Sequence, residues 1–395
     1  MSYRILSLDG GGTWALIQVK ALIALYGAST TGRSVLQDFD LVAANSGGSI
    51  VLGGLVEGLA LRDILNLLED QARRESVFSP TSSLGDKFLH DLTGLGPKYS
   101  AENKLAAFEK AFPRKGATPL TAAVEGIRRP GSSADVHLLI VAFDYNRNRA
   151  AFFRSSQASG PGWGVGDTMD ATLAEAIHAS TNAPVNYFDA PAAFPDRPDR
   201  YWDGAISGCN NPVVAGVTEA IVKGQDPSSL AVLSMGTASV ALPWPQPGEE
   251  SSPYVQKTCT SQVVADLRKL ASAILDDPPD IATFLAHVMT GSGKSLDNPA
   301  ANSRVVRMNP LISPVKKNGV WSAPGSMSAD EFAYLLKLDM DAVEQAQVDA
   351  ISKYADLWVE GVVPNQPVRM DGDALQCELG QVTFPAAVAA WKAIR

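Results

Sequence analysis

Two stretches near the N-terminus repeat one pattern of hydrophobic and polar positions: an apolar run, a glycine-rich turn and an apolar helical stretch. The first unit predicts a strand over residues 3–8 and a helix over 14–26, where apolar residues recur every three or four positions. The second unit predicts a strand over 39–44 and a buried helix over 50–58. Repeated strand–turn–helix units indicate an α/β fold, a three-layer α/β/α sandwich around a mostly parallel, doubly wound sheet. Its chemistry is expected at the carboxyl ends of the strands.

The later part of the chain adds further elements and one change of composition. Prolines gather after Pro243 among glycine, glutamate and serine, so we expect a lid or insert over about 243–300. We expect a single domain over residues 1–362 and a separate C-terminal tail over 363–395. The remaining predicted strands cover 136–143, 150–154, 200–202 and 230–235. The predicted helices cover 61–68, 171–179, 212–222, 263–275, 284–289 and 335–358, and a further one begins after Ser100 with Leu105, Phe108 and Phe112 on one face.

Composition narrows the functional classes. The chain has 395 residues, and its 33 lysines and arginines against 42 aspartates and glutamates give a net charge of −9, which argues against binding to a nucleic-acid backbone. The three cysteines, Cys209, Cys259 and Cys377, form no C-x-x-C pair, so we expect neither a disulfide framework nor a bound metal. We see no secretory signal and no apolar stretch long enough to span a membrane, which predicts a cytoplasmic protein.

Ser46 lies between an apolar strand and an apolar helix and is followed by Gly47 and Gly48. This arrangement is typical of a nucleophile elbow, a strained turn that exposes the serine hydroxyl at the edge of the sheet, next to the positive end of a helix dipole. The usual pattern is G-x-S-x-G, and here Ala44 takes the first glycine position. A plain Ser-Gly-Gly turn that only starts the helix is equally consistent with this segment alone.

Asp9 precedes three consecutive glycines, Gly10, Gly11 and Gly12, at the other strand–helix turn. The N–H groups of such a turn suit an oxyanion or a phosphate. The string LDGGGT also resembles the first phosphate loop of actin-like sugar kinases, so ATP binding is an alternative. A purely structural turn is the third interpretation.

Asp203 follows a short predicted strand and precedes Gly204 and Ala205. A carboxylate at this edge is a candidate base, although aspartate there also serves as a helix cap or turn former. The chain order Ser…Asp…His would leave only His287 as a third catalytic member, and His287 lies within an apolar helical stretch. Asp203 is therefore the candidate base acting directly on Ser46.

Together these segments resemble the patatin-like phospholipases, which use a Ser–Asp dyad. SLDGGGTWAL is similar to the family's oxyanion loop D-G-G-G-x-R-G, AANSGGS to its elbow, and YWDGAISGCNNP to its D-G-[GA] aspartate with the N-N-P that follows. PKYSAENKL, VAFDYNRNRAAFF, EAIHASTNAPVNYF and AVLSMGTA are similar to secondary family blocks, in family order. The similarity covers about residues 3–240, with a weaker echo in RVVRMNPL and LKLDMDAVEQAQVDAI.

The resemblance implies a serine lipid acyl hydrolase, a phospholipase A or esterase that needs no cofactor and no metal. Its substrate would be a phospholipid or another acyl ester, with transient contact to a membrane surface and none to nucleic acid. Trp14 stands where the family has arginine, and Ala15 where it has glycine. These departures leave a weakly active or non-catalytic effector of the same fold as an alternative beside the kinase. The implied roles are Ser46 as nucleophile, Asp203 as base, Gly10, Gly11, Gly12 and Gly47 as the oxyanion hole, and Asp9, Ala44, Gly48, Gly204 and Ala205 as supporting motif residues.

Overall fold

The computed structural model describes residues 2–80, 98–156, 171–184, 187–195, 197–238, 242–243, 245–257, 278–291, 302–368 and 379–395. In this part of the chain eight strands form one sheet, in the order β5-β6-β3-β2-β1-β7-β8 with β4 paired to β3, and β9 and β10 form a separate hairpin. The strands are β1 (Tyr3–Leu8), β2 (Leu41–Asn45), β3 (His137–Asp144), β4 (Arg149–Arg154), β5 (Ala192–Ala193), β6 (Arg200–Asp203), β7 (Leu230–Met235), β8 (Val305–Met308), β9 (Val315–Lys317) and β10 (Val320–Ser322).

The register of the sheet sets the two candidate catalytic residues side by side. The neighbours β3, β2, β1, β7 and β8 pair in parallel, whereas β4, β6 and β5 pair antiparallel at one side. On β3, Val141 pairs with Asn45 and Ala142 pairs with Asp203. The last residue of β6 therefore lies beside the turn that follows β2, although β6 runs in the opposite direction.

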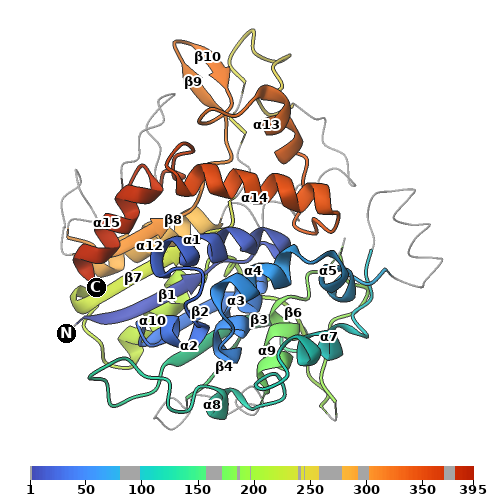
Figure 1. The fold of residues 1–395 in the computed structure, drawn as a ribbon, viewed down its shortest axis with the longest axis vertical. Helices are drawn as coiled ribbons and strands as arrows, with labels where there is room; N and C mark the ends of the chain where they lie inside the picture. The colour runs from blue at the N-terminus through green and yellow to red at the C-terminus, as the bar shows by residue number, and fades with distance from the viewer. Residues whose placement is uncertain are drawn as a thin grey trace.

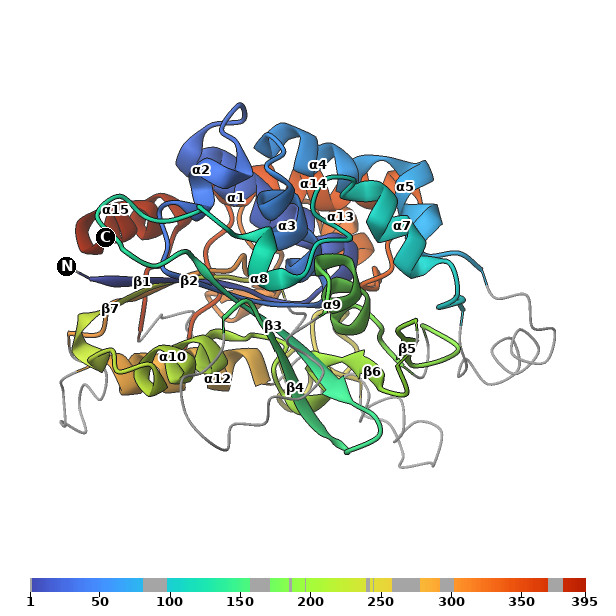
Figure 2. The same ribbon diagram turned by 90° about the horizontal axis from the view of Figure 1, so that it is seen from below.

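Helices cover both faces of the sheet, which confirms the predicted three-layer α/β/α fold (Figures 1 and 2). One face packs against α10 and α12, where Ile5 and Val232 share a hydrophobic cluster. The other face carries the larger cluster, which includes Leu6 and Leu8. Alternate residues of β1 thus face opposite layers, as expected for a strand buried on both sides. The helices are η1 (Gly12–Ala15), α1 (Leu16–Tyr26), α2 (Gly32–Leu36), α3 (Ser46–Glu57), α4 (Leu61–Glu69), α5 (Gln71–Val77), α7 (Lys104–Ala111), α8 (Leu120–Ala123), α9 (Leu173–Ser180), η2 (Gly204–Ser207), α10 (Val213–Val222), η3 (Pro227–Ser229), α12 (Pro278–Thr290), α13 (Ala329–Leu335), α14 (Gln345–Val359) and α15 (Phe384–Ile394).

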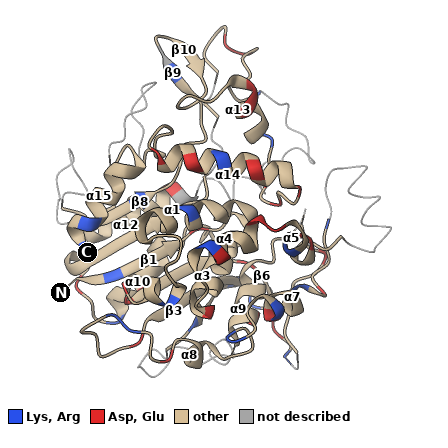
Figure 3. Cartoon of the chain, in the orientation of Figure 1, with Lys and Arg blue, Asp and Glu red and all other residues tan. Residues whose placement is uncertain are grey.

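Charged residues lie mostly outside the sheet (Figure 3), as expected for a sheet that is buried between two layers of helices. Lysine, arginine, aspartate and glutamate lie mainly on the outer helices and loops, and the strands are largely free of them (Figure 3). None of the described helices is both long and apolar enough to cross a membrane. A charged pair inside the sheet is therefore an exception, and one occurs beside the candidate site.

The C-terminal segment packs onto the domain instead of standing apart as a tail. Trp391 of α15 is fully buried and stacks on Phe39, with ring centroids 5.7 Å apart. Phe384 packs edge-on against Trp358 of α14 at 4.7 Å. These aromatic contacts make residues 384–394 part of the main hydrophobic core.

The segment expected as a lid is described only in part. Its helix α12 buries Ala282 and Ala286 in the cluster shared with α10 and β8, so this stretch belongs to the helical layer under the sheet (Figure 2). The helix expected over 263–275 lies outside the described residues.

The single helix predicted over 335–358 is wrong. α13 ends at Leu335 and α14 begins at Gln345. Between them the Met340 carbonyl accepts from the Thr13 N–H and the Asp339 carbonyl accepts from the Trp14 indole, both in the turn after β1. An apolar periodicity continues across this break in the sequence, but the tertiary partners of the carbonyls decide the conformation.

Candidate active site

Ser46 occupies the turn between β2 and α3 and is the first residue of the helix. Its φ of 46° lies in the left-handed region, which is rare for a residue with a Cβ and is the strain expected at a nucleophile elbow. Its backbone N–H donates to the Ser180 hydroxyl at 2.9 Å, which stabilises this conformation. The backbone at Gly48 lies close to the turn after β1. A Cβ on Gly48 would be only 2.7 Å from the Asp9 carbonyl oxygen. Ser46 thus occupies a strained and closely packed strand–helix turn.

Asp203 ends β6 and faces this turn. The Ser46 side chain lies close enough to the Asp203 carboxyl group to lower its pKa. The Asn45 side-chain amide donates to Asp203 Oδ1 at 3.0 Å, and the Ala205 backbone N–H donates to the same oxygen at 2.9 Å. The backbone N–H of Asp203 donates to the Asn182 carbonyl at 2.9 Å. The carboxylate thus lies beside the serine while two donors fix its orientation.

The environment of Asp203 tunes its basicity. Its side chain is buried, and burial raises the pKa of the carboxyl group above its ordinary value. Hydrogen bonds from Ala205 and Asn45, the nearby Ser46 side chain and the charge of Lys104 act in the opposite direction but do not cancel the effect of burial. A raised pKa makes the carboxylate a better proton acceptor for a serine hydroxyl.

The described histidines lie apart from this pair. His137 hydrogen-bonds to a glutamate of α10 at 3.0 Å, and His287 to a serine at 3.0 Å. His178 is buried, and burial together with the nearby charge of Lys104 lowers its pKa to about 3. In the described part of the chain no histidine hydrogen-bonds to Ser46 or Asp203, which agrees with a two-residue arrangement.

Lys104 is a site residue that the sequence analysis missed. Its side chain is almost fully buried, and Nζ donates to the Thr181 carbonyl at 2.7 Å and to Asn182 Oδ1 at 3.2 Å. Nζ also lies 3.7 Å from the centroid of the Phe188 ring. Lys104 thus fixes the turn after α9, which supplies the Ser180 hydroxyl and the Asn182 carbonyl to the site. A lysine in a helical pattern normally indicates a solvated face, so only the tertiary structure shows this role.

The glycine turn after β1 lies directly beside Ser46. The Gly10 N–H donates to the Asn210 carbonyl at 2.8 Å, and a Cβ on Gly10 would lie 3.0 Å from the Ser46 Cβ. Gly12 has a φ of 56°, and a Cβ on Gly47 would lie 2.8 Å from the Gly12 nitrogen. The glycine turn and the start of α3 can approach this closely only because these positions carry no Cβ. The Gly12 amide therefore lies against the start of α3.

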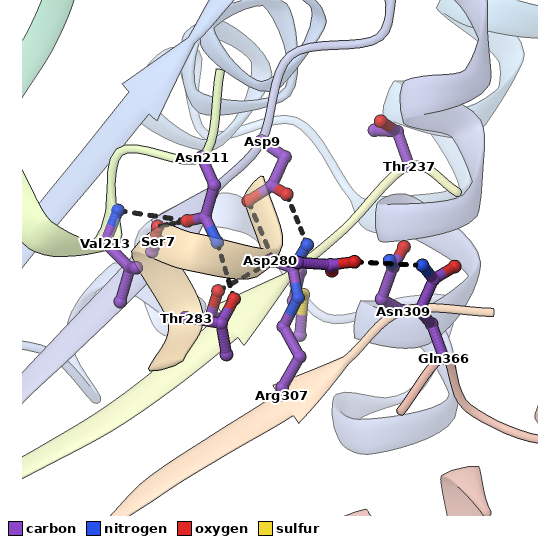
Figure 4. Close-up of polar contacts among 12 residues, drawn as sticks. Ser7, Asp9, Asn211, Val213, Thr237, Asp280, Thr283, Arg307, Asn309 and Gln366 are labelled. Carbon is purple, nitrogen blue, oxygen red and sulfur yellow. Dashed lines mark hydrogen bonds and ion pairs between the residues drawn. The ribbon is translucent and has the colours of Figure 1, made fainter. Parts of the chain in front are cut away.

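Asp9 anchors this turn through a buried ion pair with Arg307 of β8 (Figure 4). Arg307 Nη1 donates to Asp9 Oδ1 at 2.9 Å and Nη2 donates to Oδ2 at 2.6 Å, and Nη1 also donates to the Ser234 hydroxyl at 2.8 Å. Burial raises the pKa of Asp9 to about 6, although the charge and hydrogen bonds of Arg307 lower it. Neither β8 nor this partner was predicted from the sequence, where the second arginine of RVVRMNPL was the available signal.

A segment defined by residues 338–342 covers the site from outside. The Thr13 N–H donates to the Met340 carbonyl at 3.0 Å, and the Tyr187 hydroxyl donates to Asp339 Oδ1 at 2.6 Å. Asp341 Oδ2 accepts further bonds from a lysine and a tyrosine on the facing side, at 2.9 and 2.7 Å. The 338–342 segment is thus fixed at several points around Ser46.

The free space at Ser46 is correspondingly small. Ser46, Gly47, Phe188 and Met340 are among the residues that line a cavity of about 20 Å³, which is enough for about one water molecule. Met340 is the residue of the 338–342 segment that lines this cavity.

Trp14, at the position of the family arginine, belongs to the same arrangement. Its indole is 6% exposed, and Nε1 donates to the Asp339 carbonyl at 3.1 Å. The ring meets Tyr354 of α14 edge-on, with centroids 6.4 Å apart. Trp14 therefore holds the 338–342 segment against the glycine turn.

The fold and the site together define an α/β protein with a serine at a strained strand–helix turn and a buried aspartate next to that serine. A family model for patatin-like phospholipase matches residues 6–216, which is more than half of the chain and includes both Ser46 and Asp203. The chain belongs to the patatin-like phospholipase family.

Two individual proteins show the extent of the likeness. The chain is 26% identical over 215 residues to an intracellular phospholipase A2 of Caenorhabditis elegans, and the aligned region is 53% of this chain but only 16% of that protein. The crystal structure of VipD from Legionella pneumophila aligns with a TM-score of 0.35 and 12% identity, over 90% of this chain and 67% of that chain.

Proposed function

We propose that this protein is a serine lipid acyl hydrolase that uses Ser46 as nucleophile and Asp203 as base. The observation that carries the proposal is the position of Ser46, at a turn with a φ of 46°, beside a buried carboxylate that Asn45 and Ala205 orient. A serine that only started a helix would need neither the strained backbone nor an oriented carboxylate. Membership of the patatin-like phospholipase family supports the reaction class.

The proposed reaction has two steps. In the first, Asp203 takes the hydroxyl proton while Ser46 Oγ bonds to the ester carbonyl carbon, and collapse of the tetrahedral intermediate releases the alcohol, which takes the proton from Asp203. In the second, Asp203 takes a proton from water, the hydroxide attacks the acyl-serine, and Ser46 regains its proton as the fatty acid leaves. The pair needs no external cofactor.

The oxyanion is assigned to N–H groups of Gly11, Gly12 and Gly47. Gly12 lies against Gly47 at the start of α3, where the helix dipole also favours negative charge. Gly10 is not assigned to the oxyanion hole, because its N–H donates to the Asn210 carbonyl. We assign Gly10 to the close packing between the glycine turn and Ser46.

The supporting motif residues hold this geometry. Asp9 fixes the glycine turn through its buried partner, and Ala205 supplies one hydrogen bond to the Asp203 carboxylate. Gly204 lies against Asn45, where a Cβ would sit 2.5 Å from Oδ1. Ala44 ends the run of small residues on β2 next to the elbow.

The proposed substrate is a phospholipid or another lipid acyl ester, met at a membrane surface. The family supports this class, and a nucleic-acid partner is not proposed. The kinase alternative receives no support from the site: LDGGGT lies inside the matched family region, and the turn faces a serine–aspartate pair.

Acyl release tests the proposal. Wild type and Ser46→Ala are compared on short p-nitrophenyl esters and on phospholipid vesicles, and both are treated with a fluorophosphonate probe. Ser46-dependent acyl release and labelling are expected. A folded wild-type protein that neither labels nor releases acyl groups would instead be the non-catalytic effector, and ATP turnover without acyl release would indicate the kinase.

A further inference from the structure

A cavity of about 740 Å³ runs alongside α3, within the size range of small-molecule sites. It shares Gly12, Ile50, Val77 and Phe78 with the small cavity at Ser46, so the two spaces adjoin. We propose that this cavity, formed between α3, α4, α5 and α7, binds the fatty acyl chain of the ester that Ser46 attacks. The inference rests on the proposed function and deepens it by naming where the acyl group lies.

The length of the cavity follows α3. Ser46 begins this helix, Ile50 lies one turn further along, and Glu57 ends it. Ile50 and Glu57 both line the cavity, and residues 46 to 57 of an α-helix span roughly 16 Å. A chain that starts at an acylated Ser46 therefore has an extended path beside the helix.

The walls of the cavity suit an aliphatic chain. Leu67 and Leu68 of α4 and Phe108 and Phe112 of the α7 region line it and are buried. Burial of methylene groups against such side chains is favourable in proportion to the apolar area removed from water.

Three charged groups that line the cavity already have partners. At its far end the exposed Arg114 donates through Nε to the buried Glu57 Oε1 at 2.9 Å, and this pair closes the end of α3. Arg74 is buried and donates to the Val343 carbonyl at 2.9 Å, next to the 338–342 segment. The exposed Asp63, Arg73 and Lys110 are also among the lining residues. The exposed charged residues lie on the solvent side of the cavity. The part of the cavity lined by buried apolar side chains is therefore available to an uncharged acyl chain.

Tryptophan substitution on α7 tests the cavity directly. Ala107 and Ala111 line the cavity and are half-buried, whereas Ala106 of the same helix is exposed and is not among the lining residues. Ala107→Trp and Ala111→Trp are compared with the matched control Ala106→Trp on p-nitrophenyl butyrate, octanoate and laurate. We expect kcat/KM for laurate to fall roughly 10- to 100-fold in the first two variants, because several methylene groups lose their contacts. Butyrate turnover should change little, and Ala106→Trp should resemble wild type.

A binding measurement separates this inference from the proposed function. Ser46→Ala is titrated with the fluorescent fatty acid cis-parinaric acid, with and without Ala111→Trp. Saturable binding that Ala111→Trp weakens supports the cavity even if wild type shows no acyl release, in which case only the proposed function fails. Equal laurate-to-butyrate ratios in wild type, Ala106→Trp and Ala111→Trp, with unchanged cis-parinaric acid binding, would overturn the acyl-chain assignment while leaving Ser46-dependent hydrolysis intact.

Discussion

The Asn45 side-chain amide donates to Asp203 Oδ1 at 3.0 Å, and Asn45 directly precedes Ser46 in the chain. The residue before the proposed nucleophile therefore orients the carboxylate of the proposed base. This bond ties the position of the Asp203 carboxylate to the turn that carries Ser46. The Ser180 hydroxyl adds to this coupling, since it lies 3.4 Å from Asn45 Oδ1 and accepts the Ser46 N–H.

Loss of either member of the pair should abolish most of the activity. We expect Ser46→Ala and Asp203→Asn each to reduce kcat by roughly 10³–10⁶, and the double variant to be little worse than either, because the two residues act as one unit. Single-turnover and steady-state kinetics on a short ester measure this. His287→Gln is the control and should keep most of the activity. A histidine variant as inactive as Ser46→Ala would contradict the dyad.

The acid limb of the pH profile should report on Asp203. The reaction needs the carboxylate, and burial raises its pKa, so activity should fall as the pH drops through a value above the ordinary aspartate pKa of 3.8. Asn45→Ala removes a hydrogen bond that lowers this pKa. In Asn45→Ala the acid limb of the pH profile of kcat/KM should therefore move to higher pH. A purely structural role of Asn45 would instead lower the maximum of kcat/KM without moving this acid limb.

The position of Ser46 and Asp203 was predictable because local pattern specifies it. Each residue follows a strand and precedes glycine, and the repeated strand–turn–helix units fix where such ends meet. Burial of charged groups was not predictable in the same way. Lys104 and Arg307 stand in patterns that usually indicate surface, and only packing against distant segments shows them inside.

The break between α13 and α14 has the same origin. Apolar spacing over 335–358 favours one helix, but hydrogen bonds from Thr13 and Trp14, more than three hundred residues away in the chain, hold the 338–342 segment in another conformation. Neither periodicity nor propensity contains that information.

Access to Ser46 should depend on Met340. Met340→Ala enlarges the cavity of about 20 Å³ at the nucleophile, so we expect kcat/KM for bulky esters to rise several-fold while a small acetate ester changes little. Trp14→Phe removes the indole hydrogen bond to the Asp339 carbonyl and should act in the same direction. Met327→Ala, at a partly buried methionine packed on the main core, is the control for loss of a methionine side chain. Equal effects on small and bulky esters would show that the 338–342 segment does not limit access.

The ion pair between Asp9 and Arg307 should support both stability and catalysis. Arg307→Met leaves the buried Asp9 carboxylate without its counter-charge, and we expect the free energy of unfolding in urea to fall by about 3–5 kcal/mol. Asp9→Asn combined with Arg307→Met removes both charges and should recover part of that loss. Activity should fall in all of these variants, because the glycine turn loses its anchor.

The pH dependence of Arg307→Met gives the sharper test. Burial already raises the pKa of Asp9 to about 6, and loss of Arg307 removes the group that opposes this rise. The folded state then binds a proton more tightly than the unfolded state, whose aspartate titrates at about 3.8. Relative to wild type, the variant should therefore gain stability as the pH is lowered from 7 toward 5 and lose it as the pH rises. The double variant, which has no carboxylate at this position, should show no such gain, and a gain of equal size in the double variant would mean that another group is responsible.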